Sequence, residues 1–547
     1  MGDVGFPPHS PSDFEMADPA TQSLSRRRLF ELVGAQVGAS AAYQLMTSLG
    51  FASESPYRGP IALEGDPKGA SVVILGAGLA GMTAAIELGK AGYKVQILEY
   101  NLRPGGRNWT LRGGDVYTEL GGATQHCAFD AGLYLNPGPW RIPYHHHAIL
   151  DYCRRFGVAL EPFIQLNHNA FLHSTAAFGG KPQRIRDIKA DYDGGVAELL
   201  AKATRKGALD DALSREDQEI LLEALRALGA LDKDFRYRVG DDSAEHRGYA
   251  RDPGGGLAAR PAFSEPIGVH DILTSRLWRS LQSFLLYDFQ TTMFQPVGGM
   301  GRIGEAFARQ IPNMIRYGAK VTAIKQDDKG VTIAFEDQTA NGQAQELRAD
   351  WCLCTLPLSI LSQLPLNVSA PMKAAIEAVP YAPATKFGLQ FRRRFWEEDD
   401  HIFGGISFTD LPIRQISYPS GGLNAGGKGV LLGGYTFGGA NSYEFAAMTP
   451  AERVERAVDD GAQIHPQYRA EFENGMSVAW HRVPFTLGCA GDWSDEARAA
   501  HYDNLCQIDG RIALAGEHAS FIPAWQEGAI LSALDAVQRL HKRVVAS

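Results

Sequence analysis

The feature that most constrains the fold is a glycine-rich turn that joins a short apolar run to a helical pattern. The apolar run Val72–Leu75 predicts a buried strand, and the helical pattern after the turn continues to about Gly92. A second apolar run, Val95–Leu98, predicts a second strand. The turn has the spacing G-x-G-x-x-G, with its glycines at Gly76, Gly78 and Gly81. This order of elements predicts a β–α–β unit whose two strands are parallel.

Each part of this unit suits the binding of an adenine dinucleotide. Gly76 permits a tight turn, Gly78 lets the backbone approach a pyrophosphate, and Gly81 lets the helix and strand pack closely. The pyrophosphate charge is expected at the helix N-terminus. Glu99 ends the second strand, where its carboxylate can accept hydrogen bonds from a ribose. The alternative is a β–α–β turn without a ligand, but the strands, the helix and the acid all occur in the expected order.

The C-terminal region carries a second acid at the end of a predicted strand. Residues 510–517 form an apolar run that ends in Gly516 and Glu517, and a helix is predicted over Gln526–Val545. Backbone N–H groups at the start of that helix can stabilise negative charge on a reduced flavin ring, and Glu517 can accept from ribityl hydroxyls. The alternative is an ordinary strand, loop and helix with a surface acid. Together with the N-terminal unit, this region indicates one cofactor site built from both ends of the chain.

The composition bounds the possible classes of protein. The chain has 547 residues, which predicts two or three domains. Its net charge of −9 gives no reason to expect binding to nucleic acid or to an anionic membrane. The six cysteines are scattered, which argues against a dense disulfide framework or a zinc-ligand array. Two of them, Cys352 and Cys354, share one face of an apolar strand and are interpreted as core thiols.

The N-terminal segment has two interpretations. Residues 25–30, SRRRLF, precede a weakly apolar stretch that extends to about Ala52. This order resembles a twin-arginine export signal, which predicts a periplasmic or secreted protein. The alternative is an amphipathic helix docked on the body of a cytoplasmic protein. The apolar stretch contains Glu31 and Gln36, so it is a poor candidate for a membrane span.

Two further segments carry a family resemblance. Residues 103–107, RPGGR, follow the dinucleotide unit as the glycine doublet does in FAD-containing amine oxidases. Residues 136–146, NPGPWRIPYHH, are similar to the arginine-bearing segment of L-amino acid oxidases. The chain therefore resembles the flavin amine oxidase superfamily over about residues 71–545, and most of all the L-amino acid oxidases of bacteria and snake venoms and L-glutamate oxidase. The resemblance is weakest in the helical middle of the chain.

The resemblance implies an α/β multidomain fold with three parts and an N-terminal extension. A Rossmann-like FAD-binding domain is assembled from discontinuous segments, beside a mixed-sheet substrate-binding domain and a helical insertion. The expected segments are 71–140, 291–355 and 478–547 for the FAD-binding domain, 141–168 and 356–477 for the substrate-binding domain, 169–290 for the helical insertion and 1–70 for the extension. The pattern of residues 150–290 is mostly helical, as in Arg215–Leu228.

The resemblance also implies roles for three residues at the substrate. Arg141 matches the arginine that clamps the substrate α-carboxylate, a role that suits a planar guanidinium fork. Tyr435 matches the tyrosine whose hydroxyl makes a second hydrogen bond to that carboxylate. Lys386 matches a lysine that holds a water near flavin N5 and aids the reaction with oxygen. The alternatives are a buried ion pair for Arg141, core packing for Tyr435 and an ordinary strand position for Lys386.

The remaining implied roles concern the cofactor and the walls of the substrate site. Arg107 matches an arginine that contacts the cofactor phosphates, with a surface arginine as the alternative. Trp525 matches an aromatic wall of the substrate cage, and the carbonyl of Ala524 is placed to accept from the substrate amine. The residues implied to contact the cofactor are Gly76, Gly78, Gly81, Glu99, Arg107, Gly138, Pro139, Trp140, Arg141, Val321 (through its backbone, at the adenine), Trp480, Gly516, Glu517 and Trp525. The pair Gly121 and Gly122 also resembles a flavin turn, which leaves open whether these glycines or Gly138 touch the flavin.

The implied reaction is the oxidative deamination of an L-amino acid by FAD. Oxygen is the second substrate, and the products are a 2-oxo acid, ammonia and hydrogen peroxide. The first alternative is an amino-acid 2-monooxygenase, which gives an amide and CO2. Further alternatives are an oxidase of polyamines or aromatic amines, which Arg141 argues against, and a flavoprotein that serves as a binding module. The resemblance also implies a homodimer or a higher homo-oligomer.

A cysteine and a histidine run are interpreted without special chemistry. Cys489 lies near the position where monoamine oxidases attach flavin covalently, but it lacks the aromatic neighbour found there, so FAD is expected to bind noncovalently. His145, His146 and His147 are consecutive, and adjacent residues rarely converge on one ion. No carboxylate or cysteine set accompanies them in the sequence, so we expect no metal site.

Overall fold

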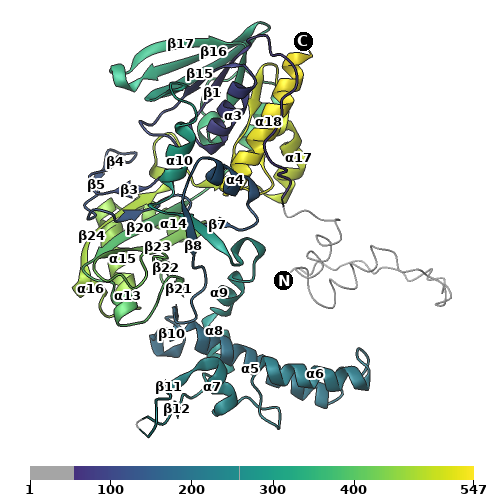
Figure 1. Cartoon of the computed structure of the whole chain (residues 1–547), viewed down its shortest axis with the longest axis vertical. Helices are drawn as coiled ribbons and strands as arrows, with labels where there is room; N and C mark the ends of the chain where they lie inside the picture. Colours follow the sequence, from purple (N-terminus) through teal and green to yellow (C-terminus); the bar gives the residue numbers. More distant parts are fainter. Residues whose placement is uncertain (1–54, 258, 547) are drawn as a thin grey trace, which may run out of the picture. The chain divides into compact units, whose positions relative to one another are not determined.

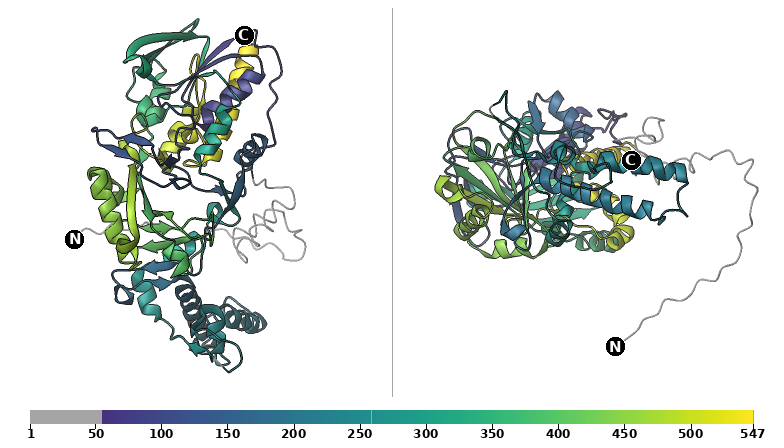
Figure 2. Two further views of the ribbon diagram at one scale, coloured as in Figure 1. Left: turned by 60° about the vertical axis from the view of Figure 1, so that its left-hand side comes forward. Right: turned by 90° about the horizontal axis from the view of Figure 1, so that it is seen from below.

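A computed structural model of the chain describes residues 55–257 and 259–546. The chain divides into two compact units, Met1–Pro56 and Tyr57–Ser547, and the description that follows concerns the second unit. The signal-like segment of residues 25–52 lies outside the described residues, so its interpretation stays a prediction. Figure 1 labels the helices and strands, and Figure 2 gives two further views of them. Within the described ranges, no helix is both long enough and apolar enough to cross a membrane.

A parallel five-stranded sheet is assembled from distant segments of the chain (Figure 1). Its strands lie in the order β14-β2-β1-β18-β26, of which Figure 1 labels β1, and every neighbouring pair is parallel. Their bounds are Ser71–Leu75 for β1, Lys94–Leu98 for β2, Ile315–Arg316 for β14, Trp351–Cys354 for β18 and Ile512–Leu514 for β26. Helix α3 (Leu79–Lys90) connects β1 to β2, so the predicted β–α–β unit is present. Strand β26 brings the C-terminal region into the same sheet as β1.

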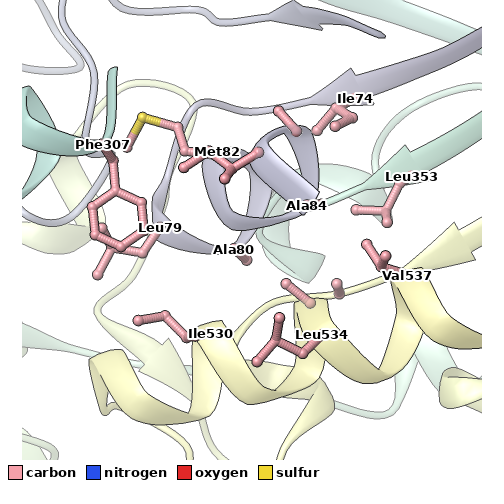
Figure 3. Packing of buried hydrophobic residues seen from close by; sticks show 14 of the residues in the cluster. Ile74, Leu79, Ala80, Met82, Ala84, Phe307, Leu353, Ile530, Leu534 and Val537 are labelled. Carbon is pink, nitrogen blue, oxygen red and sulfur yellow. The ribbon is translucent and has the colours of Figure 1, made fainter. Parts of the chain in front are cut away.

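The parallel sheet is covered on both faces. Val72 and Ile74 of β1 belong to a hydrophobic cluster with α3 and the C-terminal helix α18 (Gln526–Val545), whereas Val73 and Leu75 belong to a second cluster. Figure 3 shows apolar side chains of α3 and α18 meeting in the first cluster. Because successive side chains of a strand point to opposite faces, burial on both sides explains the continuous apolar run of β1.

The second cluster lies between the parallel sheet and elements that the chain forms between β14 and β26. A three-stranded antiparallel sheet and three helices contribute to it. These elements are β15 (Ala319–Asp327), β16 (Gly330–Asp337), β17 (Gln343–Ala349), α11 (Leu358–Leu361), α12 (Ala370–Glu377) and α17 (Asp495–Cys506). Cys352 and Cys354 of β18 are buried here and form no disulfide, which confirms that they are core thiols.

A second large sheet has seven strands in the order β10-β9-β21-β22-β23-β20-β24. Its neighbours are antiparallel except for β9 and β21. The bounds are Phe171–His173 for β9, Gln183–Arg184 for β10, Ala384–Phe391 for β20, Ile406–Thr409 for β21, Gln415–Ser417 for β22, Gly429–Phe437 for β23 and Phe472–Ala479 for β24. In β20, Phe387 packs in the hydrophobic core of this region, so the preceding Lys386 points to the opposite face. Lys386 is the register partner of Tyr435 on β23.

The expected helical insertion is present, but strands occur in the same range. Its helices are α5 (Ile185–Arg205), α6 (Arg215–Leu228), α7 (Asp241–Arg247), α8 (Val269–Ser275) and α9 (Trp278–Ser283), with the hairpin β11 (Tyr249–Arg251) and β12 (Ala262–Phe263). Strands β9 and β10 and also β8 (Leu160–Phe163) lie within the range of residues 150–290, where the pattern was mostly helical. Two of them pair with later segments, β8 with β13 (Met293–Pro296) and β9 with β21, and such long-range pairing leaves little local signal, whereas β10 pairs with β9.

The remaining elements are mostly short. They are β3 (Leu111–Arg112), β4 (Val116–Thr118), β5 (Thr124–His126), β6 (Tyr134–Leu135), β7 (Ile142–Pro143), α4 (His147–Arg155), η1 (Phe178–Gly180), η2 (Tyr287–Phe289), α10 (Gly301–Ala308), η3 (Gln338–Ala340), β19 (Tyr381–Ala382), α13 (Phe395–Glu398), α14 (Gly439–Ala447), α15 (Pro450–Ala462), α16 (Tyr468–Glu471), η4 (Trp480–Arg482), β25 (Ala490–Gly491) and η5 (Glu517–Ala519).

The arginine-bearing segment, residues 136–146, contains only the two-residue strand β7 and leads into α4. The short pairing of β7 with β13 and side-chain hydrogen bonds hold the segment. Asn136 accepts from the hydroxyl of Thr110 at 2.8 Å and from the backbone N–H of Met300 at 2.9 Å.

Candidate active site

A cavity of about 480 Å³ brings together residues from both ends of the chain and from both large sheets. The predicted site residues in its lining are Gly76, Gly78, Glu99, Arg107, Gly138, Pro139, Trp140, Arg141, Lys386, Tyr435, Trp480, Gly516, Glu517, Ala524 and Trp525. Two predicted cofactor residues, Gly81 and Val321, are not part of the lining.

The glycine turn is shaped as the sequence predicts. Gly76 has a φ of +102°, and a Cβ added there would lie 2.8 Å from the hydroxyl oxygen of Thr355. A Cβ on Gly81 would lie 2.0 Å from the carbonyl oxygen of Gly76, so Gly81 is needed for close packing of helix and strand. A Cβ on Gly78 would meet no atom within 4 Å, because Gly78 borders the cavity.

The N-terminus of α3 is available to an anion. Gly78 is its N-cap residue, no side chain caps the helix, and its first turn contains no acid. The first N–H groups of a helix lack intrahelical partners and carry partial positive charge. A phosphate beside Gly78 would therefore find donors and a favourable field without any cationic side chain.

Glu99 is buried at the carboxyl end of β2 and is held by three donors. Its carboxylate accepts from the backbone N–H of Ala77 at 2.6 Å, and from the backbone and side-chain nitrogens of Asn101 at 2.8 and 2.7 Å. Ligands of open α/β sheets bind outside the carboxyl ends of the strands, which is where Glu99 lines the cavity. Its contact with a ribose stays a prediction.

Arg107 is not the surface arginine of the alternative interpretation. Its Nη1 donates to Glu517 Oε1 at 2.7 Å and to the carbonyl oxygen of Cys489 at 2.6 Å. Burial alone would lower the pKa of Arg107, but the Glu517 carboxylate outweighs it and the pKa is raised. Burial would likewise raise the pKa of Glu517, and the charge of Arg107 outweighs it and lowers the pKa. The pair is charged at neutral pH and joins the two predicted halves of the cofactor site.

The start of α18 forms another wall of the cavity. Trp525 is the N-cap residue, and no side chain caps the helix. The preceding Ala524 has a φ of +68° and donates its N–H to Glu517 Oε2 at 2.9 Å. Gly516, with a φ of +141°, donates its N–H to the hydroxyl of Ser532 at 2.9 Å. This geometry gives a second helix N-terminus that faces the cavity, as expected for a group that gains negative charge.

Arg141 lies half-buried in the cavity between two aromatic rings. Its guanidinium carbon lies 5.0 Å from the ring centre of Trp140 and 4.4 Å from that of Phe289. Nη1 donates to the side-chain oxygen of Gln165 at 2.9 Å, and the buried Nε has no hydrogen-bond partner. Among the described residues, no carboxylate lies within salt-bridge distance of Arg141. Removal from bulk water lowers the pKa of Arg141 to about 10, so the group is a cation at neutral pH.

Lys386 is buried among the same aromatic side chains. Its Nζ lies 4.6 Å from the ring centre of Trp140 and 4.7 Å from that of Tyr435. It donates to the carbonyl oxygens of Gly138 and Asn136. Burial, more than the positive charge of Arg141, lowers the pKa of Lys386 to about 7. Lys386 is therefore not the solvated strand lysine of the alternative interpretation, and its charge changes near neutral pH.

Aromatic side chains fix the shape of the cavity around these two cations. The rings of Trp140 and Tyr435 meet edge to face, with their centres 5.3 Å apart. Trp480 is almost fully buried and donates its Nε1 hydrogen to the carbonyl oxygen of Pro137 at 2.8 Å. Cys489 also lines the cavity, and burial raises the pKa of its thiol to about 11. A neutral thiol is a poor nucleophile, which agrees with the expectation that it forms no bond to the flavin.

Val321 and the glycine pair Gly121 and Gly122 lie outside the cavity lining, as Gly81 does. Val321 is buried in β15, outside the cavity lining, and its contact with adenine stays a prediction. Gly121 and Gly122 belong to the turn of the β4–β5 hairpin and do not line the cavity, whereas Gly138 does. A Cβ on Gly138 would lie 1.9 Å from the carbonyl oxygen of Arg107, so only glycine fits there.

Two residues of the site were not found in the sequence. Gln165 is the hydrogen-bond acceptor for Arg141, and Phe289 stacks on its guanidinium. Gln165 follows β8 in a segment without regular structure, and Phe289 ends the short helix η2. No motif surrounds either residue, so the sequence held no signal for them.

The comparison with known families identifies the class of the protein. Residues 79–541 match the family described as flavin containing amine oxidoreductase. The match spans most of the chain, from the glycine turn through the cavity walls to α18, so the chain belongs to this family. It is therefore a flavoprotein oxidoreductase, as the resemblance implied.

Curated relatives place the chain near the L-amino acid oxidases within that family. An L-amino-acid oxidase of Siganus canaliculatus is 29% identical over 483 residues, which are 87% of this chain and 86% of that protein. A flavin-dependent L-tryptophan oxidase, RebO, of Lentzea aerocolonigenes is 31% identical over 500 residues, which are 86% of this chain and 97% of that protein. A protein of Bacillus subtilis described as a putative L-amino-acid oxidase is 26% identical over 481 residues.

Solved structures confirm the α/β fold class. Cyclohexylamine oxidase from Brevibacterium oxydans matches with a TM-score of 0.55 and 16% identity, covering 87% of this chain and 99% of that structure. A putrescine oxidase variant matches with the same TM-score and 14% identity. At this level of identity the likeness concerns the fold alone.

Proposed function

We propose that this protein is an FAD-dependent L-amino-acid oxidase. The observation that carries the proposal is the half-buried guanidinium of Arg141, which faces the cavity without a carboxylate partner among the described residues. An incoming α-carboxylate would supply the missing anion and bond in a planar, bidentate geometry. A simple amine carries no such group, so an unpaired guanidinium would have no use in an enzyme for simple amines.

The cavity supports FAD as a noncovalent cofactor. The α3 N-terminus suits the pyrophosphate, Glu99 suits the ribose, and the start of α18 suits the flavin ring. Arg107 is within the same lining and can reach an anionic group while it remains paired with Glu517. When bound, the flavin supplies the redox chemistry of oxidation and of the reaction with oxygen.

The residues of the chain bind and orient the amino acid. Arg141 and the hydroxyl of Tyr435 would hold the carboxylate, and Trp525 with Phe289 would flank the side chain. Such orientation can supply ~7–11 kcal/mol of the barrier reduction in favourable cases. Lys386, with a pKa of about 7, would hold a water molecule beside the cofactor and can change its charge there. The substrate amine must lose a proton before reaction, and no strong base among the lining residues is required for that step.

The walls favour a large apolar or aromatic substrate side chain. The lining around Arg141 includes Phe289, Ile406, Phe408, Phe437 and Trp525. Apart from Arg141 and Lys386, the charged lining residues are Glu99, Arg103, Arg107 and Glu517, which belong to the proposed cofactor part. The name of the similar L-tryptophan oxidase agrees with this choice.

A peroxide assay across the twenty L-amino acids and a few D-forms tests the proposal. We expect peroxide, ammonia and a 2-oxo acid from L-forms, with the highest rates for aromatic and large apolar side chains. Formation of an amide and CO2 would instead identify a 2-monooxygenase. Failure of amino acids to bleach the flavin without oxygen would indicate a binding module. The proposed homo-oligomer is tested separately by light scattering of the purified protein.

The role of Lys386 has its own test. We expect Lys386→Met to slow oxidation of the reduced enzyme by oxygen by roughly 10²-fold, a loss typical of a group that stabilises developing charge. Anaerobic reduction by the amino acid should change much less. Stopped-flow measurement of both half-reactions provides the comparison, and equal slowing of the two would exclude Lys386 from the oxygen reaction.

A further inference from the structure

Three titratable side chains converge at the N-terminus of α4, and the proposed reaction uses none of them. They are His145, His146 and Asp288. One candidate ligand atom from each lies within 4.8 Å of the others, and His145 Nε2 lies 3.2 Å from Asp288 Oδ1. The sequence argument against a metal site had two grounds, that adjacent residues rarely converge on one ion and that no carboxylate or cysteine set accompanies the histidines. The fold supplies a carboxylate from a position 143 residues further along the chain.

A tight turn explains how two consecutive histidines reach the same place. His146 is the N-cap residue of α4, and its N–H donates to the carbonyl oxygen of Pro143 at 3.1 Å. The N–H of His147 donates to the carbonyl oxygen of His145 at 3.0 Å. The two rings therefore lie 4.7 Å apart and at 82° to each other, instead of pointing to opposite sides as in a strand. Asp288 approaches from η2, where the Tyr287 ring packs 4.1 Å from that of His145.

The hydrogen bonds of the apoprotein leave this cluster incomplete. His145 and His146 are buried, with 5% and 2% of their surfaces exposed. Within the described residues, His145 Nδ1 and His146 Nε2 have no hydrogen-bond partner. Buried polar atoms are nearly always paired, because an unpaired one costs free energy. His145 already contacts Asp288 through Nε2, whereas the buried Nε2 of the adjacent His146, beside this carboxylate, has no partner in the described part of the chain, which points to a ligand.

We propose that His145, His146 and Asp288 bind a zinc ion, with water completing the coordination. Two imidazoles and one carboxylate are a donor set that zinc accepts, whereas calcium and magnesium prefer oxygen ligands. Two ligands about 2.0–2.1 Å from a tetrahedral ion stand about 3.3 Å apart. The 3.2 Å between His145 Nε2 and Asp288 Oδ1 matches that separation.

The proposed zinc site contacts the aromatic residues that would flank the substrate in the cavity. The His146 ring packs edge to face on Trp525, with the ring centres 5.0 Å apart. Asp288 immediately precedes Phe289, whose ring stacks with the guanidinium of Arg141. An ion would join the start of α4 to η2 and hold both walls in one position. This consequence rests on the proposed function, whereas the binding of zinc does not.

Calorimetric titration of the holoenzyme with zinc chloride, after removal of metals by a chelator, tests the site. We expect one zinc ion to bind per chain, and Asp288→Asn to weaken binding at least tenfold. The matched controls are Asp242→Asn and His270→Ala, which change exposed residues outside the cluster and should leave the affinity unchanged. Anomalous diffraction at the zinc edge should place the ion between His145 and Asp288.

Several outcomes would overturn the proposal. These are the absence of stoichiometric binding, equal affinity in Asp288→Asn and its controls, or an anomalous peak elsewhere. His145→Gln provides a second ligand variant if Asp288→Asn does not fold, and flavin absorbance and the melting temperature check both. Zinc should also shift KM for the amino acid by at least twofold in the wild type and not in Asp288→Asn. If the wild type binds zinc but oxidises no amino acid, the metal site stands and the proposed function fails.

Discussion

Two groups of charged residues in the cavity are arranged in opposite ways. In the ion-pair group, the partly buried Arg107 lies 2.7 Å from the buried carboxylate of Glu517, and both charges are satisfied within the chain. In the aromatic group, Arg141 and Lys386 lie against rings and neutral oxygen acceptors. The charges of the ion-pair group stabilise the structure of the site, whereas those of the aromatic group are available to interact with a ligand. Substitutions in the two groups should therefore affect different measurements.

The largest effect is expected in the ion-pair group. Arg107→Met leaves Glu517 buried without its partner, and breaking a buried pair in this way costs about 3–5 kcal/mol of stability. We expect loss of that size in the free energy of unfolding in urea, together with loss of bound flavin. Arg302→Met is the control, because Arg302 belongs to an exposed pair with Glu305. A loss of equal size in the control would show that the burial of the pair is not what matters.

In contrast to Arg107→Met, Arg141→Met should weaken substrate binding and leave the stability of the protein intact. We expect KM for the amino acid to rise by roughly 10–150-fold, since hydrogen bonds to charged groups contribute about 1.5–3 kcal/mol. The free energy of unfolding should stay the same or increase, because the variant removes a partly desolvated charge without a carboxylate partner. Steady-state kinetics with an amino acid and with the matching amine, which lacks the carboxylate, measure the effect. A similar change for both compounds would contradict the carboxylate clamp.

Lys386 should make stability depend on pH in a defined window. Its pKa is about 7 in the folded protein and about 10.4 in an unfolded chain. Between these values the unfolded chain binds more protons, so stability should rise with pH relative to Lys386→Met. We expect a relative gain of about 1–2 kcal/mol from pH 7 to pH 10, since water penetration reduces the full effect of burial. Urea unfolding at several pH values gives the difference, and a flat difference would contradict the lowered pKa.

The smallest effect on KM is expected from Gln165, which positions the guanidinium of Arg141 in the aromatic group. Gln165→Leu removes the acceptor that holds Arg141, without removing the charge. The guanidinium keeps its contact with the substrate carboxylate and loses only its positioning, so we expect a cost of about 1 kcal/mol, below the full value of a charged hydrogen bond, and a rise in KM of about fivefold with little change in kcat. Gln415→Leu is the control, since Gln415 also lines the cavity but has no hydrogen bond to Arg141 among the described residues. Equal effects of the two variants would remove Gln165 from a positioning role.

The sequence was sufficient to predict those features in which one local pattern determines both the structure and the chemistry. The glycine turn, the strand that ends in Glu99 and the helix Gln526–Val545 all occur as predicted. Each depends on interactions within a few residues, such as the contact between Gly81 and Gly76. The pairing of Arg107 with Glu517 was not predicted, although both residues were, because it joins positions 410 residues apart.

The remaining features depend on contacts between distant irregular segments. Gln165 and Phe289 meet Arg141 only after β8 pairs with β13 and η2 folds against the start of α4. The strand β9 was missed for the same reason, since its partner β21 lies more than 230 residues further along the chain, and β10 pairs only with β9. The pair Gly121 and Gly122, which the sequence left open as a flavin turn, lies in the β4–β5 hairpin outside the cavity lining, whereas Gly138 belongs to the lining.

The position of Lys386 in β20 limits how this family member can change. Neighbouring residues of that strand serve two compartments, with Phe387 in a hydrophobic core and Lys386 in the cavity. Inserting or deleting one residue ahead of them would exchange the two, which places an ammonium in the core and a phenyl ring beside the cofactor. Within this family the length of β20 ahead of Lys386 should therefore be conserved, whatever changes elsewhere in the sequence.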